Sequence, residues 1–332
     1  MDPEPALAIE GLTVEFPAAD GGWRPVLRGV TLAVAAGERV ALVGESGSGK
    51  SVIALASLGL VAAPGRVAGG RVRVAGVDLA ESPAPRLRRI RGGAIGLVFQ
   101  EPASAFNPVF TVGFQIAEAA RAHRGVSRPE ARAIARRLLE TTAVDRPSEV
   151  ALAYPHQLSG GQLQRAMIAL ALAGDPGLLI ADEPTTALDL ETQARILELL
   201  RGLTEAGRAL LLISHDLAVV AGLVDRVVVL FCGEVVESAP TGELFGRPLH
   251  PYTRWLLAAA EGSMGGAAAA TRSSGEPSAA GCRYAHRCGL AQPGCLRRSP
   301  PLEAVGPRRT LRCPVVRDEE RAVPSPREPG NG

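Results

Sequence analysis

Two spacings of apolar residues divide the chain into regions. Apolar and polar residues alternate along residues 6–36 (ALAIEGLTVEF, then VLRGVTLAVAAGE), and RVRV at 71–74 repeats the pattern. A period of two places every second side chain on one face, which is typical of half-buried strands. The sequence therefore predicts antiparallel strands over 6–36, joined by a further strand at 71–74.

Four runs are apolar almost throughout and predict buried strands: 39–43 (RVALV), 94–99 (AIGLVF), 177–181 (GLLIA) and 209–213 (ALLLI). Between them, apolar residues recur at helical spacing within 113–173 and again within 191–203 (ETQARILELLRGL). Strands that alternate with helices imply a mostly parallel sheet, here with a helical insertion. Residues 226–237 (RVVVLFCGEVVE) predict a closing hairpin.

The octapeptide that follows the strand at 39–43 reads G-x-x-x-x-G-K-S, the phosphate-binding loop. Its backbone N–H groups and the N-terminus of the next helix would face an anion. We expect Lys50 to reach the β- and γ-phosphates and the Ser51 hydroxyl to ligate magnesium. Lys50 is the only lysine among 36 basic residues, which fits a position that needs a compact ammonium. The predicted phosphate-binding residues are Gly44, Glu45, Ser46, Gly47, Ser48, Gly49, Lys50 and Ser51.

Two carboxylates, Asp182 and Glu183, end the apolar strand LLIA. Asp182 at the strand tip is placed to hold magnesium, and Glu183 is the candidate base that polarises the attacking water. An exposed acidic pair at an ordinary strand end is the alternative, and the upstream phosphate loop argues against it.

A second anion site is predicted where Ser159-Gly160-Gly161 opens the helix-forming run QLQRAMIALALAG. It combines a hydroxyl, two flexible backbone N–H donors and a helix dipole. A serine N-cap followed by two glycines is the simpler interpretation, but it does not account for the whole run. Two phosphate sites in one chain suggest that two chains sandwich the nucleotide.

With LSGGQLQR at 158–165, the chain resembles the ABC-type ATPases from about residue 6 to 240. The resemblance implies ATP hydrolysis and an α/β P-loop NTPase fold. That fold has a mostly parallel core sheet, an antiparallel β subdomain, a helical subdomain inserted at about 101–175, and here a small C-terminal extension. By position, Gln100 in FQEP would sense magnesium and water and couple to a membrane partner. His215 in SHD would contact the γ-phosphate.

The same resemblance completes the set of expected site residues. The catalytic residues would be Glu183, His215 and Gln100, and the magnesium ligands Ser51, Gln100 and Asp182. The nucleotide contacts from the second anion site would be Ser159, Gly160, Gly161 and Gln162, with Asp189 from the D-loop at 187–189. Adenine stacking is expected on Phe16, near the end of the first strand, with Trp23 as the rival.

Four further segments, FQEPASAFNP, YPHQLSGG, DEPTTALD and HPYTRWLL, together resemble the ATPases of oligopeptide and dipeptide importers. The resemblance implies a second ABC ATPase subunit (a copy or a paralogue), two membrane-spanning permease subunits and an extracytoplasmic substrate-binding protein. The chain would then lie at the cytoplasmic face of the membrane. Some members of this group move nickel or sugars, so the cargo stays open. Glu101 and Phe106 depart from the group's usual Asp and Leu without touching the chemistry.

Four of the five cysteines fall late in the chain, in the spacing C-x5-C-x6-C-x17-C: Cys282, Cys288, Cys295 and Cys313. A cytoplasmic location argues against disulfides, and a segment too small for its own core suggests a metal staple. Because some peptide-importer ATPases carry a 4Fe–4S cluster on a similar quartet, the resemblance favours iron–sulfur. Zinc and unliganded or disulfide-forming thiols are the alternatives. Cys232 is expected to be a small buried hydrophobe.

Charge and hydropathy further narrow the class of protein to which the chain can belong. The net charge of +2 divides into +5 over residues 263–332, from eleven arginines and six acidic residues, and −3 over residues 1–262. Bulk charge therefore excludes nucleic-acid binding by the main body, and a soluble ABC ATPase acting on DNA is the weaker alternative. The acidic start MDPEPALAIE lacks the apolar core of a secretory signal, and charges interrupt every apolar stretch short of a membrane span. The expected domains are 1–240 for nucleotide binding, 241–321 for the extension and 322–332 for a disordered tail.

Overall fold

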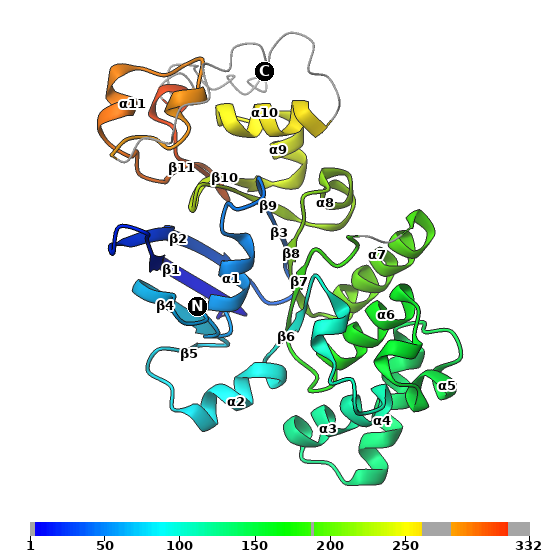
Figure 1. Cartoon of the computed structure of the whole chain (residues 1–332). Coiled ribbons are helices and arrows are strands. Elements are labelled where there is room, and N and C mark those ends of the chain that lie inside the picture. Colours follow the sequence, from blue (N-terminus) through cyan, green and yellow to red (C-terminus); the bar gives the residue numbers. More distant parts are fainter. Residues whose placement is uncertain (1–3, 187–188, 261–279, 318–332) are drawn as a thin grey trace, which may run out of the picture.

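The computed structural model describes residues 4–186, 189–260 and 280–317. Its N-terminal part is an antiparallel sheet with the strand order β2-β1-β4-β5 (Figure 1). The strands are β1 (Leu7–Pro17), β2 (Trp23–Val34), β4 (Arg66–Val74) and β5 (Val77–Asp78). Residues 71–74 form the second half of β4, which pairs antiparallel with β1. The strands predicted over 6–36 and at 71–74 are confirmed.

A second sheet of eight strands carries the core, in the order β11-β12-β10-β9-β3-β8-β7-β6. Strands β9, β3, β8, β7 and β6 are parallel, and β10 returns antiparallel to β9 as the predicted hairpin. The strands are β3 (Arg39–Val43), β6 (Ile95–Val98), β7 (Leu178–Asp182), β8 (Ala209–Ile213), β9 (Arg226–Phe231), β10 (Glu234–Pro240), β11 (Glu303–Gly306) and β12 (Arg309–Leu311).

The parallel strands are apolar throughout because both faces of the sheet are covered. In β3, Ala41 and Val43 pack into one buried cluster, and Val40 and Leu42 pack into another on the opposite face. A strand covered on both faces has no solvent side on which to place polar residues. This arrangement explains why the predicted core strands show no alternation.

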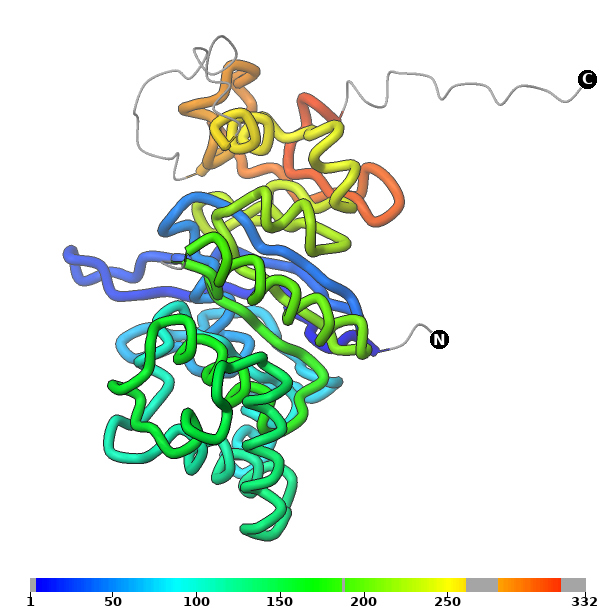
Figure 2. The backbone as a smooth tube through the Cα atoms, turned by 90° about the vertical axis from the view of Figure 1, so that its right-hand side faces the viewer, coloured from blue at the N-terminus to red at the C-terminus, as the bar shows by residue number. Residues whose placement is uncertain are grey.

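Helices connect these strands and form a separate lobe. The lobe lies at the opposite end of the molecule from the C-terminal extension in both views (Figures 1 and 2). Ser127 begins the second of its long helices with a capping box to Glu130, and Gly125 ends the first in the left-handed conformation. The lobe comprises η1 (Pro102–Ala105), α3 (Val112–Arg124), α4 (Arg128–Thr141), α5 (Pro147–Leu152), η2 (Pro155–Gln157) and α6 (Gly160–Ala171). The connecting helices are α1 (Lys50–Ala56), α2 (Ala84–Gly93), α7 (Leu190–Glu205) and α8 (Leu217–Leu223).

The C-terminal extension joins the core sheet. Strand β12 pairs antiparallel with β10, with Glu237 opposite Leu311. The buried Glu237 carboxylate accepts hydrogen bonds from the backbone N–H groups of Leu249 and His250 and from Arg309. Those donors offset the cost of burying a charge and tie residues 249–250 and strand β12 of the extension to β10. The extension comprises α9 (Thr241–Gly246), α10 (Pro251–Ala260), η4 (Ala285–Arg287), α11 (Pro293–Arg297), β11 and β12.

The tail predicted over 322–332 lies outside the described residues, as do Ala187 and Leu188 of the predicted D-loop. Across the described ranges, no helix is both long enough and apolar enough to cross a bilayer.

Candidate functional site

The phosphate-binding loop lies between the end of β3 and the start of α1, and its geometry demands glycine. Gly44, Gly47 and Gly49 have φ angles of 153°, 77° and 106°, a region that side chains disfavour. A Cβ atom on Gly44 would lie 2.1 Å from the carbonyl oxygen of Leu230. The loop is therefore pressed against β9, and no larger residue fits at its first position.

Lys50 is buried inside this loop. Its Nζ donates to the carbonyl oxygens of Gly44 and Glu45, both at 2.9 Å. Burial lowers the pKa of Lys50, while the nearby carboxylates of Glu183 and Asp182 act in the opposite direction. The Oγ of Ser48 is buried without a hydrogen-bond partner in the described structure. An anion in the loop would satisfy that hydroxyl, which fits phosphate binding.

Asp182 and Glu183 occupy different environments at the end of β7. Burial raises the pKa of Asp182, against a lowering effect from its hydrogen bond with the Ser51 side chain. Glu183 adopts a left-handed φ of 47°, and its N–H donates to the carbonyl of Ile213 on β8. A left-handed φ is uncommon for a residue other than glycine, so the backbone of Glu183 is strained.

Three polar side chains surround the Glu183 carboxylate. The amide Nε2 of Gln100 and the hydroxyl of Thr186 each donate to Oε2 at 3.0 Å. Nδ1 of His215 lies 3.2 Å from Oε1. The predicted catalytic residues therefore meet at one carboxylate, although they come from three loops far apart in the sequence.

Gln100, Glu183 and His215 face a cavity of about 490 Å³. It is lined by Val26, Ser46, Gly47, Gly49, Lys50, Ser51, Val52, Gln100, Glu183 and His215. Val26, from β2, was missed because an isolated valine in an alternating strand carries no chemical signal. Thr186 was also missed, although its position in DEPTT three residues after Glu183 offered a clue.

A second cavity, of about 470 Å³, contains the other predicted anion site and shares no lining residue with the first. It is lined by Asp145, Ser159, Gly160, Gly161, Gln162, Arg165, Asp189, Glu191, Thr192 and Arg195. Ser159 is the N-cap of α6, and its hydroxyl accepts from the N–H of Gln162 in a capping box. Asp189 caps α7 by accepting from the N–H and hydroxyl of Thr192. One chain thus contains two separate cavities, each lined in part by polar side chains.

The two aromatic candidates for adenine stacking lie outside the lining of both cavities. Phe16, on β1, is half-buried, and its ring packs where a Cβ on Gly65 would stand. Trp23, paired opposite Pro17, is 43% exposed, and the guanidinium of Arg66 lies 3.7 Å from its ring centroid. The choice between the two rings stays a prediction.

The cysteine quartet gathers in the extension without forming a metal-binding group. Cys282 donates its backbone N–H to the carbonyl of Cys295 at 2.7 Å, and burial raises the pKa of Cys282 to about 11, with contributions from the other three thiols. Burial also raises the pKa of Cys288 and Cys313. Metals bind the thiolate, and among the described residues no three His, Cys, Asp or Glu side chains are arranged to hold a metal. The geometry therefore does not support the predicted iron–sulfur cluster, nor zinc. Cys232 is half-buried against the core, close to the prediction.

The fold and the grouping of Lys50, Asp182 and Glu183 define a P-loop nucleotide hydrolase. The family model described as ABC transporter matches residues 27–186, and the model for the oligopeptide/dipeptide transporter C-terminal region matches residues 236–295. The chain belongs to the ATP-binding proteins of ABC transporters, in the oligopeptide/dipeptide group, and is an ATPase.

Individual relatives and structures agree with that assignment. A putative peptide import ATP-binding protein of Brucella abortus (strain 2308) is 45% identical over 325 residues, 96% of this chain and 97% of the relative. The oligopeptide transport ATP-binding protein AppD of Bacillus subtilis (strain 168) is 42% identical over 302 residues, covering 89% and 92% of the two chains. The ATP-binding cassette MJ0796, solved as a dimer in a post-hydrolysis state with ADP and Pi, superimposes with a TM-score of 0.63 at 30% identity. It covers 71% of this chain and 98% of that one.

Proposed function

We propose that this chain hydrolyses ATP to energise an importer of dipeptides or oligopeptides. The observation that carries the proposal is the match over residues 236–295 to the family model described as the oligopeptide/dipeptide transporter C-terminal region. Relatives named for peptide import, matching nearly their full lengths, support it. Nickel or sugar import by the same machinery is the alternative cargo.

The chemistry is hydrolysis of the γ-phosphate by water. Loop N–H groups and Lys50 bind the phosphates, and Glu183 accepts a proton from the attacking water while Gln100 and Thr186 hold its carboxylate in place. His215 lies beside the other carboxylate oxygen and would contact the γ-phosphate of bound ATP. The oxygen donors of Ser51, Asp182 and Gln100 suit magnesium, which when bound would neutralise phosphate charge.

We propose that two ATPase subunits, identical or paralogous, close head-to-tail around ATP. The phosphate loop of one subunit would face Ser159, Gly160 and Gly161 of the other. Two cavities with no lining residue in common support this arrangement, because the two predicted anion sites of one chain do not form a single pocket. The dimeric form of the related cassette is consistent with it.

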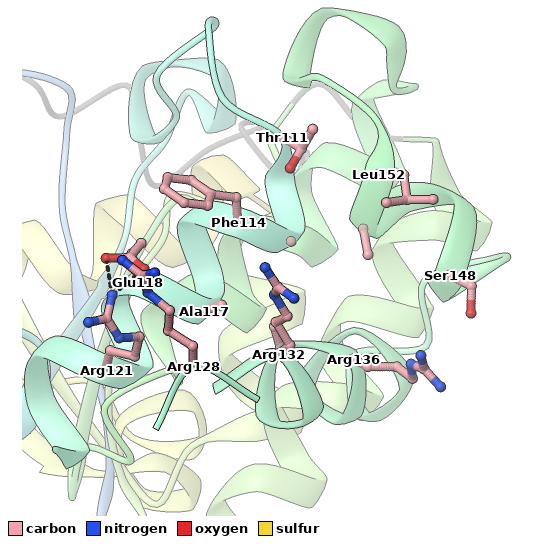
Figure 3. Close-up of a pocket in the computed structure, with 13 residues that line it drawn as sticks. Thr111, Phe114, Ala117, Glu118, Arg121, Arg128, Arg132, Arg136, Ser148 and Leu152 are labelled. Atoms are coloured by element: carbon pink, nitrogen blue, oxygen red, sulfur yellow. Dashed lines mark hydrogen bonds and ion pairs between the residues drawn. The ribbon is translucent and has the colours of Figure 1, made fainter. Parts of the chain in front are cut away.

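The membrane partner would dock on the helical lobe, where a cavity of about 730 Å³ lies between α3, α4 and α5 (Figure 3). Arg128, Arg132 and Arg136 lie at successive i, i+4 positions along α4, are exposed and have no ion-pair partner within the described residues. Phe114 and Leu152 add an apolar wall. We propose that a short segment of a permease subunit with acidic side chains fits here, at the cytoplasmic face of the membrane. An extracytoplasmic binding protein would deliver the cargo.

For the cysteine quartet, the family resemblance and the structure disagree: the resemblance implies a 4Fe–4S cluster, whereas the described thiols are not arranged to hold a metal. Anaerobic purification followed by iron and acid-labile sulfide analysis tests this. A colourless protein without iron or sulfide would rule the cluster out. Zinc at one ion per chain would show that the quartet binds zinc instead.

The experiment that tests the function is reconstitution of this chain with permease subunits and a substrate-binding protein from the same organism. ATP-dependent uptake of labelled dipeptides or oligopeptides is expected, and uptake should fail with Lys50→Ala. Uptake of nickel or a sugar without peptide uptake would transfer the proposal to the alternative cargo.

A further inference from the structure

Glu45, the second residue of the phosphate loop, has a partner on each of its three polar groups. Its carbonyl oxygen accepts from the Nζ of Lys50. Its N–H donates to the hydroxyl of Tyr252 at 2.9 Å, and its carboxylate accepts from Arg287 at 3.0 Å. The first contact lies within the loop, and the other two come from the C-terminal extension, 207 and 242 residues away in sequence.

Tyr252 is fixed in the position it needs for this contact. Its side chain is fully buried, with ring centroids 4.5 Å from Phe231, 5.4 Å from Tyr284 and 6.0 Å from Trp255. Nδ1 of His250, two residues earlier, accepts the N–H of Tyr252. The segment HPYT at 250–253 therefore places the Tyr252 hydroxyl against the phosphate loop from within a packed aromatic cluster.

Arg287 is held by the same cluster. Its guanidinium lies 4.6 Å from the ring centroid of Trp255 and 5.6 Å from that of Tyr284, distances at which a cation is attracted to the ring face. The side chains of Arg287 and Glu45 are only 23% and 35% exposed. The ion pair is thus partly sheltered from solvent and geometrically restrained, unlike a free surface pair.

We propose that Tyr252 and Arg287 are positioning residues for ATP binding. They hold the backbone of Glu45 so that Lys50 and the loop N–H groups already face the phosphates before nucleotide arrives. A loop that samples other conformations binds more weakly, in proportion to the fraction of time spent in the competent one. The extension therefore has two roles: it adds strands to the core sheet, and it raises the affinity of the ATP site.

This inference rests on the proposed role of Gly44–Ser51 as the phosphate loop. Lys50→Ala tests that role separately: if the variant binds ATP like the wild type, the proposed site fails, whatever Arg287 does.

The test is steady-state ATPase kinetics of the full-length chain. For Arg287→Met we expect KM for ATP to rise about fivefold while kcat stays within about twofold, because the lost contact orders the free loop and makes no contact with the reacting atoms. Tyr252→Phe, which removes only the hydroxyl, should shift KM in the same direction, and Arg287→Lys should recover most of the affinity. Arg297→Met, an exposed arginine of the same extension, is the matched control and should leave KM unchanged.

A double-mutant comparison separates positioning from a merely structural role. In a Glu45→Ala background, Arg287→Met should change KM by less than about twofold, because its partner is already gone. An equal rise in KM with and without Glu45 would overturn the proposal, as would a wild-type KM for Arg287→Met or an equal effect of the control. If Arg287→Met fails to fold, Tyr252→Phe and Glu45→Ala decide the matter, and wild-type KM values in both would refute it.

Discussion

The sharpest single prediction concerns Glu183→Gln. The substitution preserves shape and keeps an oxygen that accepts from Gln100 and Thr186, which donate to the carboxylate at 3.0 Å in the structure. It removes the group that can take a proton from water. General-base catalysis is typically worth about 10²–10⁴ in rate. At about 1.4 kcal/mol per tenfold, the barrier should rise by about 3–5 kcal/mol.

Phosphate release under saturating ATP measures the loss, and nucleotide affinity, from a fluorescent analogue, should stay within about threefold because Lys50 and the loop are untouched. Glu198→Gln, an exposed carboxylate on α7, is the control and should retain wild-type turnover. Turnover of Glu183→Gln within about threefold of wild type would remove Glu183 from the role of base.

Three further predictions test other parts of the account. Gly44→Ala should abolish nucleotide binding or folding, because the new Cβ would lie 2.1 Å from a backbone oxygen. Nucleotide titration and thermal melting measure the two effects, and normal binding would show that the loop tolerates displacement. One of the two variants Phe16→Ala and Trp23→Ala removes the ring that stacks on adenine. That variant should weaken ATP binding by about 1–3 kcal/mol and leave the affinity for inorganic triphosphate, which has no base, unchanged. Equal, small effects of both variants would place adenine elsewhere. His250 is buried and its pKa is lowered to about 3, chiefly by desolvation. The unfolded chain therefore binds one more proton between about pH 6.5 and 3, so stability should fall with decreasing pH across that window. His250→Asn should flatten the pH dependence of the unfolding free energy, and an unchanged slope would contradict the assignment.

Local pattern predicted residues that meet at the candidate site because each motif is short and follows the end of a strand. The run 39–43 forms β3 and Asp182 ends β7, both in the parallel part of one sheet, where the carboxyl ends of the strands meet at one edge. Neighbouring motifs therefore converge in space once the strand order is parallel. The strained φ of Glu183 had no sequence signal, because it is imposed by the surrounding loop.

Long-range contacts of the extension could not be predicted in the same way. Nothing in the residues around Arg287 or Arg309 indicates that they meet Glu45 and Glu237, because those ion pairs depend on how the extension packs. The addition of β11 and β12 to the core sheet is likewise invisible in RTL and EAVG, which are too short to carry a period. The metal site predicted for the cysteine quartet requires the four thiols to lie close together, as they do, but the sequence does not determine how the thiols are arranged.

The measurement that most directly tests the shared ATP site is complementation between two inactive variants. Lys50→Ala lacks the phosphate lysine, and Ser159→Arg blocks the opposing site with a bulky cation; each alone should show background hydrolysis. In a head-to-tail dimer, a mixed pair contains one site with both groups intact. If subunits mix at random, an equimolar mixture should recover about a quarter of wild-type phosphate release. Background activity in the mixture, with dimers present by light scattering, would contradict a site built from two chains.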